Sequence, residues 1–255
     1  MNEPLLTVSG LTVRYGGVVA LDDVSLRVPK GAIVGLIGPN GAGKTTMVDA
    51  LTGFARYTGE VRFAGTRLDG LPAHRRAARG LARTFQSAGI FDDLTVEENI
   101  LIGERSAARR FSTLRAIFGG RTEKPRAQTR RIIDLLDLGG SLEVPAGELS
   151  EGHRKLVSVA QALAGGPQLV LFDEPAAGLD STESAWLGRQ LRAVSESGVT
   201  ILLVDHDMEL VTSVCDELVV LDFGKVIAAG PPRQVLDDPG VVAAYLGSVT
   251  TAGDA

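Results

Sequence analysis

Residues able to hold a triphosphate stand directly behind the apolar run at residues 32–37. Their order is Gly38, Pro39, Asn40, Gly41, Ala42, Gly43, Lys44, Thr45 and Thr46. A buried strand that turns into a helix through glycines directs successive backbone N–H groups toward a phosphate. Lys44 adds a positive charge for the β- and γ-phosphates, and the Thr45 hydroxyl is placed to ligate magnesium. The segment predicts a nucleotide-binding P-loop, because a mere glycine-rich surface turn does not explain the apolar strand and helix that flank it.

Two carboxylates come after a second apolar run, at residues 169–172. Asp173 and Glu174 thus stand at the carboxyl end of an expected buried strand, the edge at which doubly wound sheets bind their ligands. Asp173 can hold the hydration shell of Mg2+, and Glu174 can orient or deprotonate the attacking water. Either acid alone could simply end a strand and cap the next segment, but the upstream P-loop favours a catalytic pair.

A third apolar run, at residues 200–204, precedes Asp205, His206 and Asp207. It delivers His206 to the same expected sheet edge, where the imidazole can meet a γ-phosphate. A lone histidine is more often structural, so the interpretation depends on its position behind the strand. Asp180 and Glu183 also fit a helix-capping pair, and capping alone could account for both.

The chain of 255 residues is 44% hydrophobic and carries a formal net charge of −5. It can bury a sizeable core, and its charge gives no general attraction for nucleic acid. Cys215 is the single cysteine, so no internal disulfide is expected. Residues 1–20 lack a basic start with a long apolar core, and no run reaches the roughly 18 apolar residues of a membrane span. We expect a cytoplasmic protein, for which any membrane role must come through a partner.

The order of patterns along the chain predicts an α/β protein. Strands are expected at residues 5–9, 11–15, 24–28, 32–37, 61–63, 169–172 and 200–204, and on either side of Gly224. Helices are expected behind the P-loop, at residues 71–79, 95–103, 128–138, 151–163 and 182–196, and in short pieces ending near residue 246. The early strands indicate a small antiparallel sheet, and the later alternation predicts a largely parallel sheet covered on both faces. The basic stretch at 105–131 fits a solvated face, with partner or lipid-headgroup contact as the alternative.

In this order the motifs resemble the ATPase subunit of ABC transporters over nearly the whole chain. The resemblance implies a P-loop NTPase fold, as a single ABC-type ATPase domain over residues 1–247. Within it we expect an antiparallel β subdomain and a helical subdomain at about residues 87–165. Residues 248–255 are expected to form a frayed tail.

The resemblance also assigns residues that spacing alone leaves open. Tyr15 falls where the family stacks an aromatic ring on adenine, with an edge-strand tyrosine as the alternative. Gln86, by itself an unremarkable amide, matches the glutamine that joins the metal site to the helical subdomain. His206 falls on the switch histidine, and Asp180 ends the segment that communicates between paired subunits.

The family signature Leu-Ser-Gly-Gly-Gln is here Leu149-Ser150-Glu151-Gly152-His153. Ser150 and Gly152 keep the positions that meet the γ-phosphate of an ATP bound by a partner subunit. Glu151 would repel a triphosphate if its carboxylate pointed inward, and His153 could weaken this half-site or make it pH-sensitive.

Among subfamilies, the likeness is greatest to the ATPases of branched-chain amino-acid importers. It rests on residues 80–86, 94–99, 174–179, 205–208 and 244–247, and on the insertion between 103 and 128. It implies ATP and Mg2+ as cofactors, and transmembrane permease subunits and a second ABC ATPase subunit as direct partners. A solute-binding protein is an indirect partner, no nucleic acid is expected, and the chain is placed at the cytoplasmic face of the membrane. Ile90, Phe91 and Leu94 are expected to form a groove for a permease helix, with burial in the core as the alternative.

Three other functions stay open on the sequence alone. The altered signature is compatible with a regulatory subunit that binds ATP, turns it over slowly and pairs with a more active ATPase. Lipopolysaccharide-export ATPases share the Tyr-Leu-Gly ending but fit the insertion less well. Soluble ABC proteins of translation or repair usually join two cassettes or carry long coiled coils, and this sequence has neither.

Overall fold

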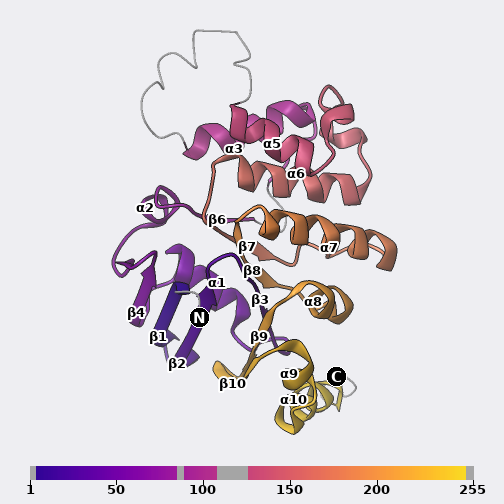
Figure 1. Ribbon diagram of the computed structural model, residues 1–255. Coiled ribbons are helices and arrows are strands. Elements are labelled where there is room, and N and C mark those ends of the chain that lie inside the picture. Colours follow the sequence, from indigo (N-terminus) through magenta and orange to yellow (C-terminus); the bar gives the residue numbers. More distant parts are fainter. Residues whose placement is uncertain (1–3, 85–88, 108–125, 251–255) are drawn as a thin grey trace.

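A computed structural model describes residues 4–84, 89–107 and 126–250 (Figure 1). Its strands are β1 (Pro4–Tyr15), β2 (Val18–Pro29), β3 (Ile33–Ile37), β4 (Thr58–Phe63), β5 (Thr66–Arg67), β6 (Leu81–Arg83), β7 (Leu169–Asp173), β8 (Thr200–Val204), β9 (Glu217–Asp222) and β10 (Lys225–Gly230). Its α-helices are α1 (Lys44–Thr52), α2 (Ala73–Ala77), α3 (Val96–Ala107), α5 (Ala127–Leu135), α6 (Glu151–Ala164), α7 (Ser181–Glu196), α8 (Met208–Val214), α9 (Pro232–Leu236) and α10 (Pro239–Thr250). Two short 3-10 helices lie at Gly139–Ser141 and Ala146–Glu148.

The central sheet has the strand order β10-β9-β3-β8-β7-β6. Strands β9, β3, β8, β7 and β6 run parallel, and β10 pairs antiparallel with β9. Every residue of β3, β7 and β8 is buried, as is typical of strands covered on both faces. The predicted parallel sheet is confirmed.

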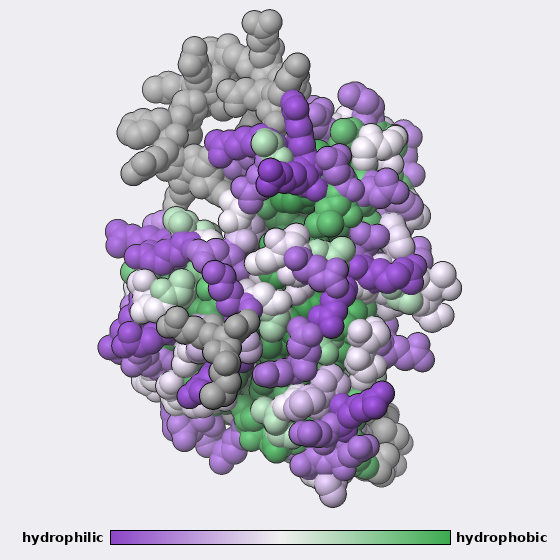
Figure 2. Space-filling view, in the orientation of Figure 1, coloured by the Kyte–Doolittle hydropathy of each residue, from purple (hydrophilic) through white to green (hydrophobic). Residues whose placement is uncertain are grey.

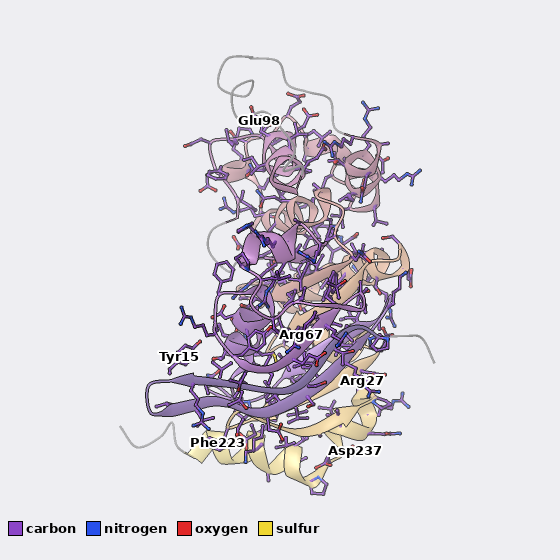
Figure 3. All side chains as sticks on the ribbon, turned by 90° about the vertical axis from the view of Figure 1, so that its left-hand side faces the viewer. Tyr15, Arg27, Arg67, Glu98, Phe223 and Asp237 are labelled. Carbon is purple, nitrogen blue, oxygen red and sulfur yellow. The ribbon has the colours of Figure 1, made fainter. Side chains whose placement is uncertain are left out.

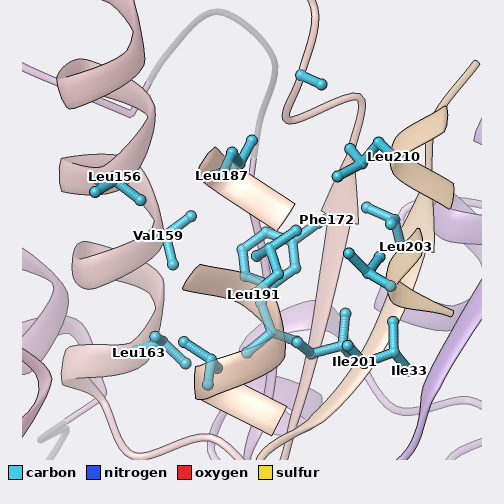
Figure 4. Close-up of a cluster of buried hydrophobic side chains, with 14 of the residues drawn as sticks. Ile33, Leu156, Val159, Leu163, Phe172, Leu187, Leu191, Ile201, Leu203 and Leu210 are labelled. Carbon is cyan, nitrogen blue, oxygen red and sulfur yellow. The ribbon is translucent and has the colours of Figure 1, made fainter. Parts of the chain in front are cut away.

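Two hydrophobic cores lie on opposite faces of this sheet, because successive side chains of a strand point in opposite directions. Ile33, Phe172 and Leu203 pack against α6, α7 and α8 on one face (Figure 4). Leu36 and Leu171 pack against α1 and the strands of the second sheet on the other face. The carboxyl ends of β3, β8 and β7 are therefore fixed side by side.

The second sheet is antiparallel, with the order β2-β1-β4-β5. The prediction of two separate strands at residues 5–9 and 11–15 is wrong, because β1 is continuous through them. Gly10 takes a φ of 62°, and the pairing with β2 shifts register between Val8 and Leu11. Such an irregularity bends a strand without ending it.

Helices α3, α5 and α6 lie together at one end of the molecule (Figure 1). On the face shown in Figure 2, polar side chains predominate and apolar residues reach the surface in separate groups.

Among the described residues, no helix combines the length and apolarity needed to cross a membrane. The subdomain limits at about residues 87–165 stay a prediction.

The remaining differences concern short elements and helix ends. Helix α2 is shorter than predicted because Pro72 is its N-cap residue and lies outside its first turn. Strand β6, with three residues, and helix α8, with seven, are too short to show a clear period, and the sequence patterns do not predict them. Helix α10 continues to Thr250, past the predicted start of the frayed tail at residue 248.

Candidate active site

The P-loop connects β3 to α1 in a backbone shape that needs glycine. Gly38, Gly41 and Gly43 have φ angles of 149°, 79° and 103°. A Cβ atom on Gly38 would lie 2.0 Å from the carbonyl oxygen of Leu221, so no side chain fits there. Helix α1 begins directly after Gly43, its N-cap residue, which has no side chain to cap the first N–H groups. These donors and the positive end of the helix dipole suit a phosphate.

Lys44 folds back over this loop. Its Nζ donates hydrogen bonds to the carbonyl oxygens of Gly38, at 2.6 Å, and Pro39, at 2.9 Å. Burial lowers the pKa of Lys44, and the negative charges of Glu174 and Asp173 partly oppose that shift. The ammonium group is thus held inside the loop and attracted by both predicted catalytic acids.

Both acids lie at the carboxyl end of β7, as predicted. Asp173 is the last residue of the strand and is 6% exposed. Glu174 has a φ of 51°, and its backbone N–H donates to the Val204 carbonyl oxygen of the neighbouring strand at 2.7 Å. A positive φ at a residue other than glycine costs about 1–3 kcal/mol, and here the contact to β8 holds it in place. The two successive carboxylates therefore leave the strand from a fixed backbone.

Asp205 fixes the loop after β8 against the loop after β7. It is 1% exposed, and its Oδ2 accepts a hydrogen bond from the Ala176 backbone N–H at 3.1 Å. Its Oδ1 accepts from the backbone N–H groups of His206, at 2.8 Å, and Asp207, at 3.0 Å. The His206 side chain is 68% exposed. The structure thus brings His206 to the same sheet edge as Glu174, with its ring open to an incoming ligand.

The other predicted site residues lie in separate parts of the molecule. Tyr15 ends β1, an inner strand of the antiparallel sheet, next to the turn into β2, and it is 53% exposed (Figure 3). Ser150 is the N-cap of α6, and Gly152 is buried in its first turn. Asp180 caps α7 in a full capping box with Glu183, so the capping interpretation holds whatever else Asp180 does. Gln86 lies outside the described residues.

The residues at the sheet edge fit a magnesium ion as well as a nucleotide. Asp173 offers a carboxylate and Thr45 a hydroxyl, both of them hard oxygen donors. The described parts of the chain hold no cluster of three or more His, Cys, Asp or Glu that could bind a metal by itself. Mg2+ is commonly held by one or two protein oxygens together with phosphates and water, so this sparse donor set suits it.

Comparison with known proteins identifies the family. A family model described as ABC transporter matches residues 21–177. A second, described as branched-chain amino acid ATP-binding cassette transporter, matches residues 225–249. A solved structure of the ADP conformation of an ATP-binding cassette of an ABC transporter has a TM-score of 0.85 and 32% identity, covering 96% of this chain and 100% of that one.

The chain belongs to the ABC transporter family of ATP-binding cassettes and is an ATPase. It is 38% identical to the high-affinity branched-chain amino acid transport ATP-binding protein BraF of Pseudomonas aeruginosa, over 97% of this chain and 99% of that protein. It is 37% identical to LivG of Escherichia coli, which bears the same description, with the same coverage. The lipopolysaccharide export system ATP-binding protein LptB of Acidithiobacillus ferridurans is 33% identical, over 97% of this chain and 98% of that protein.

Two residues near the site have contacts that the sequence patterns do not anticipate. Arg83 forms ion pairs with Asp49 and Asp173. Tyr245 of α10 accepts a hydrogen bond from the backbone of Gly38; burial raises the pKa of this tyrosine, and the hydrogen bond opposes the shift. Both residues lie in segments that carry the family resemblance, which is the signal that could have singled them out.

Proposed function

We propose that this chain binds Mg2+-ATP at its P-loop, hydrolyses it with Glu174 as general base, and thereby energises uptake of branched-chain amino acids through a separate membrane permease. The single observation that carries the catalytic part is the meeting of the P-loop, the Asp173–Glu174 pair and His206 at the carboxyl ends of three neighbouring strands. Ligands of doubly wound sheets bind at this edge.

The chain's own residues suggest how the site works. The N–H groups at the start of α1 bind the phosphates, and Lys44 exchanges its two carbonyl partners for phosphate oxygens. Bound Mg2+, held through Thr45, Asp173 and Gln86, would neutralise charge that develops on the phosphates. Glu174 accepts a proton from the attacking water. His206 donates a hydrogen bond to the γ-phosphate, and Tyr15 stacks on adenine.

A second ATP-binding subunit would complete each site with the segment Ser150–His153. In this chain the Ser150 Oγ lies 2.9 Å from the His153 Nδ1, and the His153 ring packs 5.1 Å from that of Trp186 on α7. The first turn of α6 is therefore joined to the helix that begins after Asp180. ATP would favour the closed pair because it contacts both subunits only there, and its cleavage would let them separate.

A pocket of about 530 Å3 between α2, β6, α3 and α6 is our candidate for the permease contact. Phe54 and Phe91 line it and are 61% and 54% exposed. Exposed aromatic rings around a concave surface are typical of protein contacts. Phe91 therefore fits the expected groove, whereas Ile90 packs against the core, as the alternative expected. This pocket would hold the chain at the cytoplasmic face of the membrane.

Glu174→Gln tests the catalytic assignment. The variant keeps the shape of the side chain and loses its basicity, so we expect ATP binding within about twofold of wild type and hydrolysis reduced by about 100-fold or more. With Mg2+-ATP it should accumulate as a dimer of ATP-binding subunits, measured by light scattering on a sizing column. Glu209→Gln, in the exposed first turn of α8, is the matched control and should hydrolyse ATP normally. Hydrolysis by Glu174→Gln at the wild-type rate would remove Glu174 from its role.

Two alternatives keep specific support. The first is a regulatory subunit that needs a more active partner, and the departures from the signature at Glu151 and His153 support it. The second is lipopolysaccharide export, which the likeness to LptB supports. The family match at residues 225–249 favours amino-acid import. Measuring ATPase activity alone and with co-purified membrane partners, and identifying the solute that copurifies with them, separates these three functions.

A further inference from the structure

Arg83 is the last residue of β6 and bridges two other elements of the site. Its side chain is 11% exposed, and its Nη2 lies 2.9 Å from Oδ2 of Asp173 at the end of β7. Its Nη1 forms an ion pair with Oδ1 of Asp49 on α1. One guanidinium group thus joins the strand of the predicted metal ligand to the helix of the P-loop.

The strand pairing explains why these groups meet. Strand β6 is parallel to β7, and Arg83 is paired with Leu171, two residues before Asp173. Side chains two residues apart on a strand share a face, so Arg83, Leu171 and Asp173 face the same way. Leu171 belongs to the core that contains α1, which places Asp49 on that side as well.

The contact leaves Asp173 with a defined orientation. The planar guanidinium directs Nη2 at Asp173 and Nη1 at Asp49, and this rigid geometry restrains the two carboxylates relative to each other. Because Arg83 bonds Oδ2, Oδ1 is the oxygen through which Asp173 would contact a metal. Arg83 also competes with Lys44 for this carboxylate, because Asp173 and Lys44 attract each other electrostatically. Without Arg83, the carboxylate would be free to turn toward the lysine that the phosphates need.

We propose that Arg83 is a positioning residue for Mg2+: by holding Asp173 against Asp49, it orients the carboxylate that receives the metal. The proposal rests on the function proposed above. If Arg83 had only a structural role, its loss would lower stability but would not change the Mg2+ concentration needed for tight ATP binding. A positioning role predicts that this concentration rises.

The test measures ATP affinity in EDTA and during Mg2+ titration, in the Glu174→Gln background so that ATP is not consumed. Loss of a residue that orients a metal ligand typically costs about 10–100-fold in metal affinity. We therefore expect Arg83→Met to raise the half-saturating Mg2+ concentration at least tenfold while affinity in EDTA stays within about twofold. Arg83→Lys, which keeps the charge without the planar guanidinium, should recover part of the loss, and Asp49→Asn, which removes one anchor, should show a smaller shift.

Arg76→Met is the matched control. Arg76 is also buried and also braces α1, donating to the carbonyl oxygens of Ala50 and Leu51 at 2.7 and 2.8 Å. Its loss should lower the melting temperature and leave the Mg2+ midpoint unchanged. If Arg83→Met fails to fold, Arg83→Lys and Asp49→Asn decide. Unchanged Mg2+ midpoints in the Arg83 and Asp49 variants would overturn the positioning role of Arg83 and leave the proposed function intact. If the Glu174→Gln protein itself showed no Mg2+-dependent ATP affinity, the proposed function would be overturned as well.

Discussion

Lys44, the proposed phosphate ligand, has a pKa that its surroundings shift in two directions. Burial lowers its pKa below the ordinary 10.5, even though Glu174 and Asp173 favour its charged form. Phosphate oxygens in place of the carbonyls of Gly38 and Pro39 would add negative charge next to the ammonium group and raise its pKa again. Nucleotide binding is therefore expected to be coupled to protonation of this side chain.

The sign of this coupling gives a pH prediction. ATP affinity is full at pH values below the lowered pKa of Lys44, where the lysine is already charged, and it declines as the pH rises through that pKa. Above it, the decline approaches about tenfold per pH unit until the raised pKa of the bound state is reached. Titration of ATP binding from pH 7 upward measures it, with Lys44→Arg as a control that stays charged. A flat profile for the wild-type protein would contradict the role of Lys44, as would unchanged affinity in Lys44→Ala.

Among single residues, those that directly follow a buried strand in the sequence could be predicted. Those that come into contact only through the fold could not. The P-loop, Asp173, Glu174 and His206 each stand behind a recognisable apolar run. Arg83 is 34 residues from Asp49 and 90 residues from Asp173 in the chain. Only the order of the strands in the sheet brings these three together, and spacing along the sequence does not encode it.

Among the elements, α3 and α5 are joined by a buried carboxylate. Glu104 near the end of α3 is 8% exposed and accepts a hydrogen bond from the hydroxyl of Thr129, which is fully buried on α5. It also pairs with Arg126, whose backbone N–H lies 3.2 Å from its Oε2. This contact fixes α3 and α5 to each other, and both helices also pack against α6.

We predict that Thr129→Val destabilises the protein without affecting its nucleotide site. The substitution keeps the shape of the side chain but removes a donor from a buried charge, which costs about 1.5–3 kcal/mol in free energy of unfolding. Urea denaturation measures the change. Thr212→Val is the control: the Thr212 hydroxyl donates to the Met208 carbonyl oxygen on the exposed face of α8, and its loss should cost less than about 0.5 kcal/mol. Equal stability of the two variants would mean that Glu104 gains nothing from the hydroxyl.

The long elements are predictable and the short ones are not, for a physical reason. Five-residue buried strands such as β7 and β8, and helices of 14 and 16 residues such as α6 and α7, show clear apolar patterns. Strand β6 has three residues, one of them Arg83, and is held in the sheet by its pairing with β7. Gly10 looks like an interruption in the sequence, although the second sheet accommodates it inside β1.

In the whole molecule, the proposed site draws on both sheets and on the helical end. Tyr15 lies on the antiparallel sheet, the P-loop and the proposed catalytic residues follow strands of the central sheet, and Ser150 and Gly152 lie at the start of α6. These groups would surround ATP only if the last pair came from a second subunit. The proposed function therefore depends on a nucleotide that binds with Mg2+ and joins two subunits.

The most direct measurement is ATP affinity of the purified full chain with and without Mg2+, by calorimetry, alone and together with its copurifying membrane partners. We predict saturable binding that Mg2+ strengthens and that Lys44→Ala abolishes. Absence of Mg2+-dependent ATP binding in both preparations would contradict the proposed function.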